Sequence, residues 1–261
     1  MKYRLSRQLL LWSALLTAPG IASAQLMELL PDRPILQDVM NRDVHVVVRL
    51  VQPSDQGSLL PLSTPEEVGV DVNSRRSILT SSIKADSDAD TTSYSLDYRV
   101  NGPGDHIFYA ISKPRWEQEA QRMVTEYAKV VVDAYGMGDG WDTLLGFPIE
   151  IQPLSRPYAL WVGNVFEGIV LRQGEPVPYA ELKVVYHNTG NVVMPADSYF
   201  EQIIRADSTG TFTYGIPLAG WWGFSTTTLA EQPMKNPEGD RVNHEETATM
   251  WIHALDMSKA H

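Results

Sequence analysis

The chain has 261 residues, a formal net charge of −11 at pH 7 and no cysteine. This acidic balance argues against nucleic acid and anionic lipid as partners, because both require basic surfaces. The lack of cysteine excludes disulfide bonds and a lipid anchor on cysteine, so the fold must be stabilised by its hydrophobic cores.

Residues 1–24 have the pattern of an export signal. Lys2, Arg4 and Arg7 supply a positive start, an apolar segment follows at 9–18, and Ala22-Ser23-Ala24 is a small-residue cleavage site. The apolar segment is too short for a permanent transmembrane helix. We therefore expect a cleaved signal peptide, no membrane insertion after cleavage, and a periplasmic protein.

Strand-forming runs follow in the first half of the chain. β-Branched and aromatic residues between turn signals predict strands at 44–51, 78–83, 93–100 and 106–112. Residues 115–132 fit both a helix and a strand, and we expect a short helical turn at 116–121 followed by a strand to about Tyr135. Short strands joined by turns are typical of a β-sandwich.

The second half repeats this pattern after a proline-bounded segment at 148–157, which we expect to link two domains. A hairpin is predicted at 205–224, where Asp207 and Gly210 supply the turn and Phe212 and Tyr214 alternate with threonines. Residues 231–246 are polar and predict a surface loop. Further strands are expected at 158–162, 164–171, 180–186, 198–205 and 248–255.

The sequence thus predicts an all-β protein with two antiparallel β-sandwich domains, 25–157 and 158–261, after a signal peptide at 1–24. It contains neither a Gly-x-Ser-x-Gly elbow nor a His-Glu-x-x-His helix. We expect that the protein is not an enzyme.

Two segments of the second half resemble a carboxypeptidase-regulatory-like or transthyretin-like Greek-key domain. They are the glycine-turn-proline opening at 166–184 and the later stretch at 205–214. A wider set of motifs resembles a bacterial periplasmic family of unknown-function domains associated with nickel or cobalt uptake. These motifs, in chain order, are Gly104-Asp-His-Ile-Phe-Tyr, Tyr127-Ala-Lys-Val-Val-Val, Gly140-Trp-Asp, Glu150-Ile-Gln-Pro-Leu-Ser-Arg-Pro, Gly163-Asn-Val-Phe and Ala219-Gly-Trp-Trp-Gly-Phe.

The second resemblance implies an exported, non-catalytic β-sandwich protein that works beside a metal-uptake membrane transporter, with nickel or cobalt as its ligand. The chain departs from that family where metal ligands are expected. Gln25 stands in place of the histidine that follows the cleavage site, and the stretch 50–56 lacks the histidine of a Gly-His-Pro segment. Glutamine does not replace imidazole as a metal ligand.

The candidate metal ligands are His45, His106 and Asp105, because imidazole with carboxylate suits divalent nickel or cobalt. His106 and Asp105 lie in a motif shared with the family, and His45 lies in the first predicted strand. The alternative for each histidine is a packed or surface side chain. For His106 that alternative is a hydrogen bond at the start of a strand.

Aromatic residues offer a second, metal-independent hypothesis. Trp141 and Asp142 lie in a glycine-rich turn, and Trp221 and Trp222 lie at the end of the predicted hairpin at 205–224. These four residues are candidates for a surface that holds a peptide, a glycan or an envelope partner. The alternative for the tryptophan pair is packing in a sandwich core.

Overall fold

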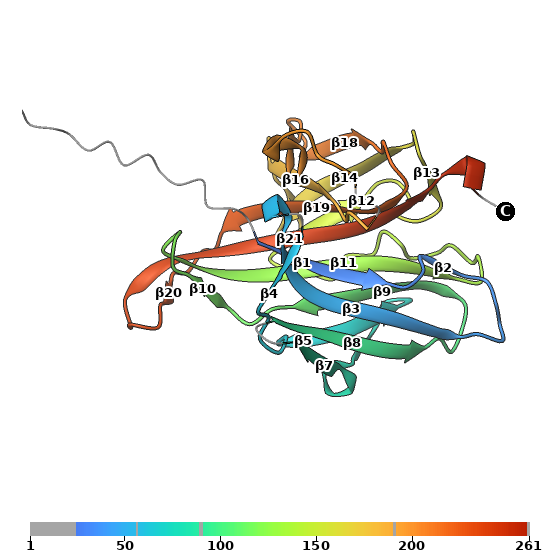
Figure 1. Ribbon diagram of the computed structural model, residues 1–261, viewed down its shortest axis with the longest axis horizontal. Coiled ribbons are helices and arrows are strands. Elements are labelled where there is room, and N and C mark those ends of the chain that lie inside the picture. Colours follow the sequence, from blue (N-terminus) through green and yellow to red (C-terminus); the bar gives the residue numbers. More distant parts are fainter. Residues whose placement is uncertain (1–24, 56, 89–90, 190–191, 260–261) are drawn as a thin grey trace, which may run out of the picture.

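The structure, a computed structural model, describes residues 25–55, 57–88, 91–189 and 192–259. Within these ranges the chain forms three β-sheets, with four short 3-10 turns between strands (Figure 1). The all-β prediction is confirmed. Over the same ranges no helix is long and apolar enough to cross a membrane. The expected signal peptide lies outside the described residues.

The first sheet has the order β1-β3-β8-β7, with β4 beside β3. Its strands are β1 (Leu26–Pro31), β3 (Asp43–Gln52), β4 (Ser58–Leu60), β7 (Lys84–Asp88) and β8 (Thr91–Arg99). The smallest sheet has the order β12-β14-β15, with β18 also on β14. Its strands are β12 (Ile149–Pro153), β14 (Val165–Arg172), β15 (Glu175–Pro176) and β18 (Thr211–Gly215).

The central sheet has the order β17-β16-β19-β21-β11-β9-β5-β6. These strands are β5 (Glu67–Val72), β6 (Arg75–Ile78), β9 (Gly104–Ile111), β11 (Arg122–Ala134), β16 (Glu181–Tyr186), β17 (Gln202–Arg205), β19 (Gly220–Leu229) and β21 (Arg241–Leu255). Four short strands flank them: β2 (Ile35–Leu36), β10 (Arg115–Glu117), β13 (Leu160–Trp161) and β20 (Met234–Lys235). The 3-10 turns are η1 (Pro53–Asp55), η2 (Thr80–Ser82), η3 (Asp197–Tyr199) and η4 (Met257–Lys259).

The central sheet joins the two halves of the chain. β11 and β21 lie side by side in parallel, in register from Arg122 opposite Asn243 to Val130 opposite Trp251. Figure 1 shows β21 running the length of the molecule, with the first sheet on one side and the small sheet on the other. The predicted boundary at residue 157 stays a prediction, although backbone hydrogen bonds connect its two sides.

Two hydrophobic cores lie on opposite faces of the central sheet. Phe108 on β9 packs in the core shared with the first sheet, whereas Ile107 and Tyr109 pack in the core shared with the small sheet. Alternate residues of one strand therefore serve different cores, as the two-residue period of a strand requires. This explains why β9 and β11 are buried along most of their length.

Trp251 on β21 anchors the N-terminal strand to the central sheet. Its indole is fully buried, and its Nε1–H donates a hydrogen bond to the carbonyl oxygen of Met27 at 3.1 Å. The ring lies over Gly223 of the neighbouring strand β19, where an added Cβ would come within 2.9 Å of the indole. Glycine at this position makes room for the tryptophan.

The predicted strands at 44–51, 93–100, 106–112, 164–171 and 180–186 are confirmed within a few residues. The predicted helical turn at 116–121 is wrong. Residues 115–117 form β10, which pairs with the start of β11 through a turn in which Gln121 has φ of +52°. The carboxylate of Glu117 lies between Arg115 of the same strand and Arg122 of β11, so the cross-strand ion pair with Arg122 favours the hairpin over a helix.

Three other expectations also differ from the structure. The hairpin predicted at 205–224 is wrong, because β17 pairs with β16 in the central sheet whereas β18 pairs with β14 in the small sheet. The predicted strand at 78–83 is replaced by the end of β6 and the 3-10 turn η2, and β7 begins only at Lys84. The predicted loop at 231–246 instead contains β20 and the first third of β21, which pair with each other. Residues 241–246 are exposed or half-buried, so their polar side chains reach solvent and this part of the strand shows no apolar alternation.

We predict that Gly223→Ala lowers the free energy of unfolding by about 1–3 kcal/mol, because the new methyl group overpacks against Trp251. The matched control is Gly215→Ala on β18. Gly215 has open space around it and no positive φ, so the change should stay within about 0.5 kcal/mol. Urea unfolding followed by tryptophan fluorescence measures both, and equal stability of the two variants would contradict this account of Trp251.

Candidate functional site

The structure does not bring the three predicted metal ligands together. His45 is exposed on β3, and its Nδ1 donates to Asp97 at 2.7 Å. His106 is buried on β9, and its Nδ1 donates to the carbonyl oxygen of Gly104 at 3.1 Å. Asp105 precedes His106 in the same strand, so its side chain lies on the opposite face.

The surroundings of His106 match the alternative of a hydrogen-bonded histidine at a strand start. Burial lowers the pKa of His106, so the ring is neutral at pH 7. Its other neighbour is the ring of Tyr98, 5.8 Å away between centroids. Across the part of the chain that the structure describes, no group of three or more His, Cys, Asp or Glu residues is placed to hold a metal ion.

The four predicted surface residues do not form one patch. Trp222 is buried in the second core, where its Nε1–H donates to the carbonyl of Leu218 at 2.9 Å. Trp221 is half-buried and packs on His253 with ring centroids 4.7 Å apart. Trp141 is half-buried against the second core and Asp142 is exposed beside it.

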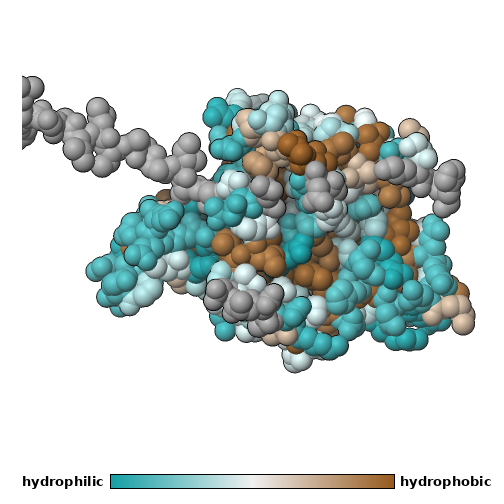
Figure 2. Space-filling view, in the orientation of Figure 1, coloured by the Kyte–Doolittle hydropathy of each residue, from teal (hydrophilic) through white to brown (hydrophobic). Residues whose placement is uncertain are grey.

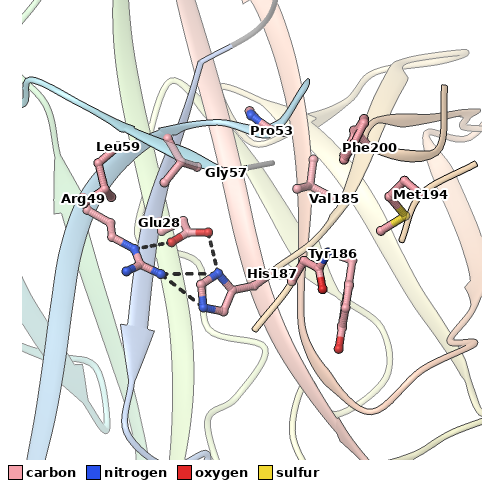
Figure 3. Close-up of a pocket in the computed structure, with 12 residues that line it drawn as sticks. Glu28, Arg49, Pro53, Gly57, Leu59, Val185, Tyr186, His187, Met194 and Phe200 are labelled. Carbon is pink, nitrogen blue, oxygen red and sulfur yellow. Dashed lines mark hydrogen bonds and ion pairs between the residues drawn. The ribbon is translucent and has the colours of Figure 1, made fainter. Parts of the chain in front are cut away.

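Sequence reasoning missed a cleft at the junction of the first sheet and the central sheet. It has a volume of about 150 Å³ and lies between β1, β3, β4 and the end of β16 (Figure 3). Its polar side is made by Glu28, Arg49 and His187, whose side chains point toward one another. Glu28 and His187 are 159 positions apart in the chain, so no sequence motif could have paired them.

The three polar side chains form a closed ring of hydrogen bonds. Arg49 Nε donates to one carboxylate oxygen of Glu28, and His187 Nδ1 donates to the other at 2.8 Å. Arg49 Nη2 lies 3.1 Å from His187 Nε2. A guanidinium is only a donor, so His187 Nε2 is the acceptor in this contact while Nδ1 faces Glu28.

This ring fixes the charge of Glu28. Burial alone would raise the pKa of Glu28, but its contacts with His187 and Arg49 hold that pKa below the ordinary value of 4.5. The carboxylate is therefore ionised at neutral pH and balanced by one guanidinium. The positive charge of Arg49 would repel an added metal cation, so this cleft does not suit a cation.

The opposite side of the cleft is apolar. Leu59 of β4 and Val185 of β16 face it, with Met194 and Phe200 from the segment after β16 (Figure 3). Figure 2 shows apolar surface gathered over the middle of this face, around β4. Leu59 is 41% exposed, which is high for a leucine beside a buried ion pair. Apolar walls around a few convergent polar groups are typical of ligand sites.

A second cleft of about 160 Å³ lies beside Gln25. Its walls carry the ion pairs of Arg122 with Glu117, at 2.8 Å, and with Glu245, at 2.7 Å. None of the described residues that line it is a histidine. The position where the resemblance implies a metal-binding N-terminus is thus surrounded by paired charges.

Comparison with known proteins shows a family but no function. A family model described as "Domain of unknown function (DUF4198)" matches residues 22–230. No curated protein matches the sequence.

Similarity to solved structures is distant. An α-2-macroglobulin from E. coli has 10% identity and a TM-score of 0.27 over 90% of this chain and 14% of that chain. The D0-D1 domain of intimin has 10% identity and a TM-score of 0.23 over 88% of this chain and all of that one. The titin Ig tandem A164-A165 has 9% identity and a TM-score of 0.22 over 90% of this chain and 98% of that chain. The chain thus spans about a seventh of the α-2-macroglobulin.

We predict that Glu28 makes the protein less stable in acid. Because its pKa is lowered by folding, its stabilising contribution is complete above about pH 4.5 and is lost as the pH falls through the lowered value. Glu28→Gln should cost about 1.5–3 kcal/mol at pH 7. It should also flatten the fall in stability below pH 4.5, measured by urea unfolding across pH.

The control is Glu181→Gln, which removes an exposed carboxylate paired with Arg205 at 3.3 Å. That variant should keep the pH profile of the wild type, because exposed ion pairs contribute little. If Glu28→Gln follows the wild type at every pH, the charged ring is not a stabilising feature.

Proposed function

The chain belongs to the DUF4198 family of domains of unknown function, and on that premise we propose that it is a non-catalytic binding protein of the bacterial cell envelope. The observation that carries this proposal is the cleft around Glu28, Arg49 and His187. Each of these groups is engaged with the other two, so none is available as a nucleophile or a general base. The envelope location rests on the export pattern of residues 1–24.

The size of the cleft limits what it can hold. A volume of about 150 Å³ corresponds to roughly five water molecules at about 30 Å³ each. Sites for drug-sized ligands are larger, about 300–1,000 Å³. The cleft therefore suits one side chain or one chain end of a peptide.

The chemistry of the cleft favours a ligand with an apolar part and an anionic group. Leu59, Met194 and Phe200 offer apolar contacts on one side. On the other side, Arg49 has five N–H donors, more than its contacts with Glu28 and His187 use. A carboxylate is the group that a guanidinium edge binds best. The occupant that combines both features is an apolar peptide segment that ends in a free carboxylate.

We predict that Leu59→Glu weakens capture of such a peptide at least tenfold, because it puts a carboxylate into the apolar wall. The probe is acetyl-Ala-Ala-Leu with a free carboxyl terminus, followed by NMR chemical shifts. Its carboxamide form should bind more weakly. Leu59 is 41% exposed, so the substitution should leave the fold intact.

The matched control is Val165→Glu on β14, where the side chain is 54% exposed and does not line the cleft. Val165→Glu should bind the probe as the wild type does. Failure of the wild type to bind the probe, or equal binding by Leu59→Glu and the wild type, would overturn the proposed ligand class.

A finer proposal follows from the resemblance to the nickel and cobalt uptake family. In it, the protein works beside a membrane transporter and binds nickel or cobalt. Its support is the set of shared motifs, and the transthyretin-like nature of residues 158–261 rests on resemblance in the same way. The described residues do not fit a histidine-rich site, because His106 is buried and hydrogen-bonded to Gly104. His45, exposed beside Asp97, is the ligand from the predicted set that solvent reaches.

This finer proposal predicts that the mature protein binds nickel or cobalt with a Kd below about 100 µM, which corresponds to about 5.5 kcal/mol. Isothermal titration of the chelator-treated protein measures it. If His45 is a ligand, His45→Ala should weaken binding at least tenfold, since imidazole is the strongest ligand available there. Absence of binding to both metals would remove the metal-uptake proposal and leave the peptide cleft unaffected.

A further inference from the structure

Two aspartates face each other in the central sheet, on the side of the second core. Asp105 of β9 and Asp133 of β11 are direct partners in the antiparallel ladder. Directly opposed residues share a face of the sheet, with Cβ atoms roughly 4.5–5.5 Å apart. Asp105 is 1% exposed and Asp133 is 6% exposed. Two carboxylates are thus buried next to each other.

Three of their four carboxylate oxygens have no hydrogen-bond partner of normal geometry: both oxygens of Asp105 and Oδ1 of Asp133. The Tyr158 hydroxyl and the Trp141 backbone N–H lie near enough to Asp105 to affect its charge state, but neither forms such a bond. The hydroxyl of Tyr158 is itself buried without a partner. Burying ionised oxygens in this way is costly unless something binds them.

The same protein shows how a structural buried acid is treated. Glu150 is 3% exposed, and its carboxylate accepts bonds from Lys129 Nζ at 2.6 Å and from the backbone N–H of Leu145 and Gly146 at 2.8 and 3.0 Å. Both oxygens of that carboxylate thus accept hydrogen bonds. Hydrogen bonds of normal geometry therefore stabilise the carboxylate of Glu150 but not that of Asp105.

In the described part of the chain, no basic side chain forms an ion pair with either aspartate. Arg156 donates to the carbonyl of Gly138 at 3.4 Å, and its charge lowers the pKa of both aspartates without such a contact. His106 lies on the other face of β9, and Asp71 on β5 adds a further acid two ladder positions away. Burial raises the pKa of Asp105, and the charge of Asp133 raises it further. Burial likewise raises the pKa of Asp133, although the backbone of Gly136 and Gly138 opposes this.

The chain crosses this site in a tight glycine loop, residues 135–140. Tyr135, Gly136, Gly138 and Gly140 all have positive φ, from +54° to +107°. Such a loop lets the backbone approach the carboxylates closely, because glycine carries no side chain. Tyr135 also has a buried hydroxyl without a partner. The site therefore combines carboxylate and phenol oxygens with the backbone N–H groups of this loop, which lower the pKa of Asp133.

We propose that Asp105 and Asp133 together bind a hard divalent cation, of the calcium, magnesium or manganese type. Two carboxylates completed by waters are a usual ligand set for magnesium, and calcium also takes only oxygen ligands. His106 lies on the other face of β9, so among the described residues the aspartate pair has no imidazole ligand beside it and does not favour nickel or cobalt. It is separate from the peptide cleft and does not depend on either function proposed above.

The rival explanation is a proton shared between the two carboxyl groups, as in acid pairs that cannot both ionise. The two explanations differ in their response to pH. A raised carboxyl pKa makes the protein lose stability as the pH rises from the ordinary value of 3.8 through the raised one. A bound cation would remove that loss, because it stabilises the ionised form.

The test uses the mature protein, treated with chelator, at pH 7.5. Calcium, magnesium and manganese are added separately, with thermal unfolding and isothermal titration as readouts. We expect at least one of them to raise Tm by several degrees and to bind with a Kd below about 1 mM. Asp105→Asn and Asp133→Asn should each weaken that binding at least tenfold. Without cation, both variants should be as stable as the wild type or more stable, since a repulsive charge is gone.

The matched control is Asp142→Asn, an exposed acid near the glycine loop, which should keep the full cation response. Leu59→Glu should keep it too, so failure of the cleft and failure of the cation site are distinguishable. The proposal is overturned if no cation changes Tm, or if both aspartate variants respond as the wild type does. It is also overturned if stability falls with rising pH equally with and without cation, which would identify the shared proton.

Discussion

The fold depends on one interaction, the parallel pairing of β11 with β21. Parallel strands require a long connection, and here that connection contains the whole small sheet and its core. Because β11 belongs to the first half and β21 to the second, their hydrogen bonds make one central sheet out of two sets of strands. Both cores use its faces, so neither could be fully covered without the other half of the chain.

The cleft is a consequence of that pairing. The cleft forms where the end of β16, carried by the central sheet, meets β1 and β3 of the first sheet, so Glu28 and His187 can touch only in the joined structure. The aspartate pair lies on the same central sheet but on its other face, where β9 and β11 are in register. One sheet thus separates the cleft, where Glu28 is paired with Arg49, from two acids that form no ion pair within the described part of the chain.

The strands could be predicted from the sequence because alternation and turn residues act locally. The helical turn at 116–121 was mispredicted because Arg122 pairs with Glu117 across a hairpin, a contact that helical periodicity does not reveal. For the sites, Asp105 was found through a motif, but Asp133 was not. Asp133 is relevant only because it lies opposite Asp105 in the sheet, and the sequence does not reveal which residues of two strands are opposite each other. Glu28 and Arg49 were not predicted for a similar reason, since a single charged residue in an apolar strand does not indicate which side chain it contacts.

Buried acids in this protein fall into three chemical situations, and the difference supports separate roles. Glu150 forms a buried ion pair with Lys129 and accepts a backbone hydrogen bond from Leu145. Glu28 is bonded to Arg49 and His187 but opens on a cleft, so its neighbours keep spare donors. Three oxygens of Asp105 and Asp133 lack a hydrogen-bond partner of normal geometry, although Arg156 and nearby backbone N–H groups lower the pKa values of these acids. Because a buried carboxylate without partners is costly, the contrast with Glu150 supports the proposed ligand of this pair.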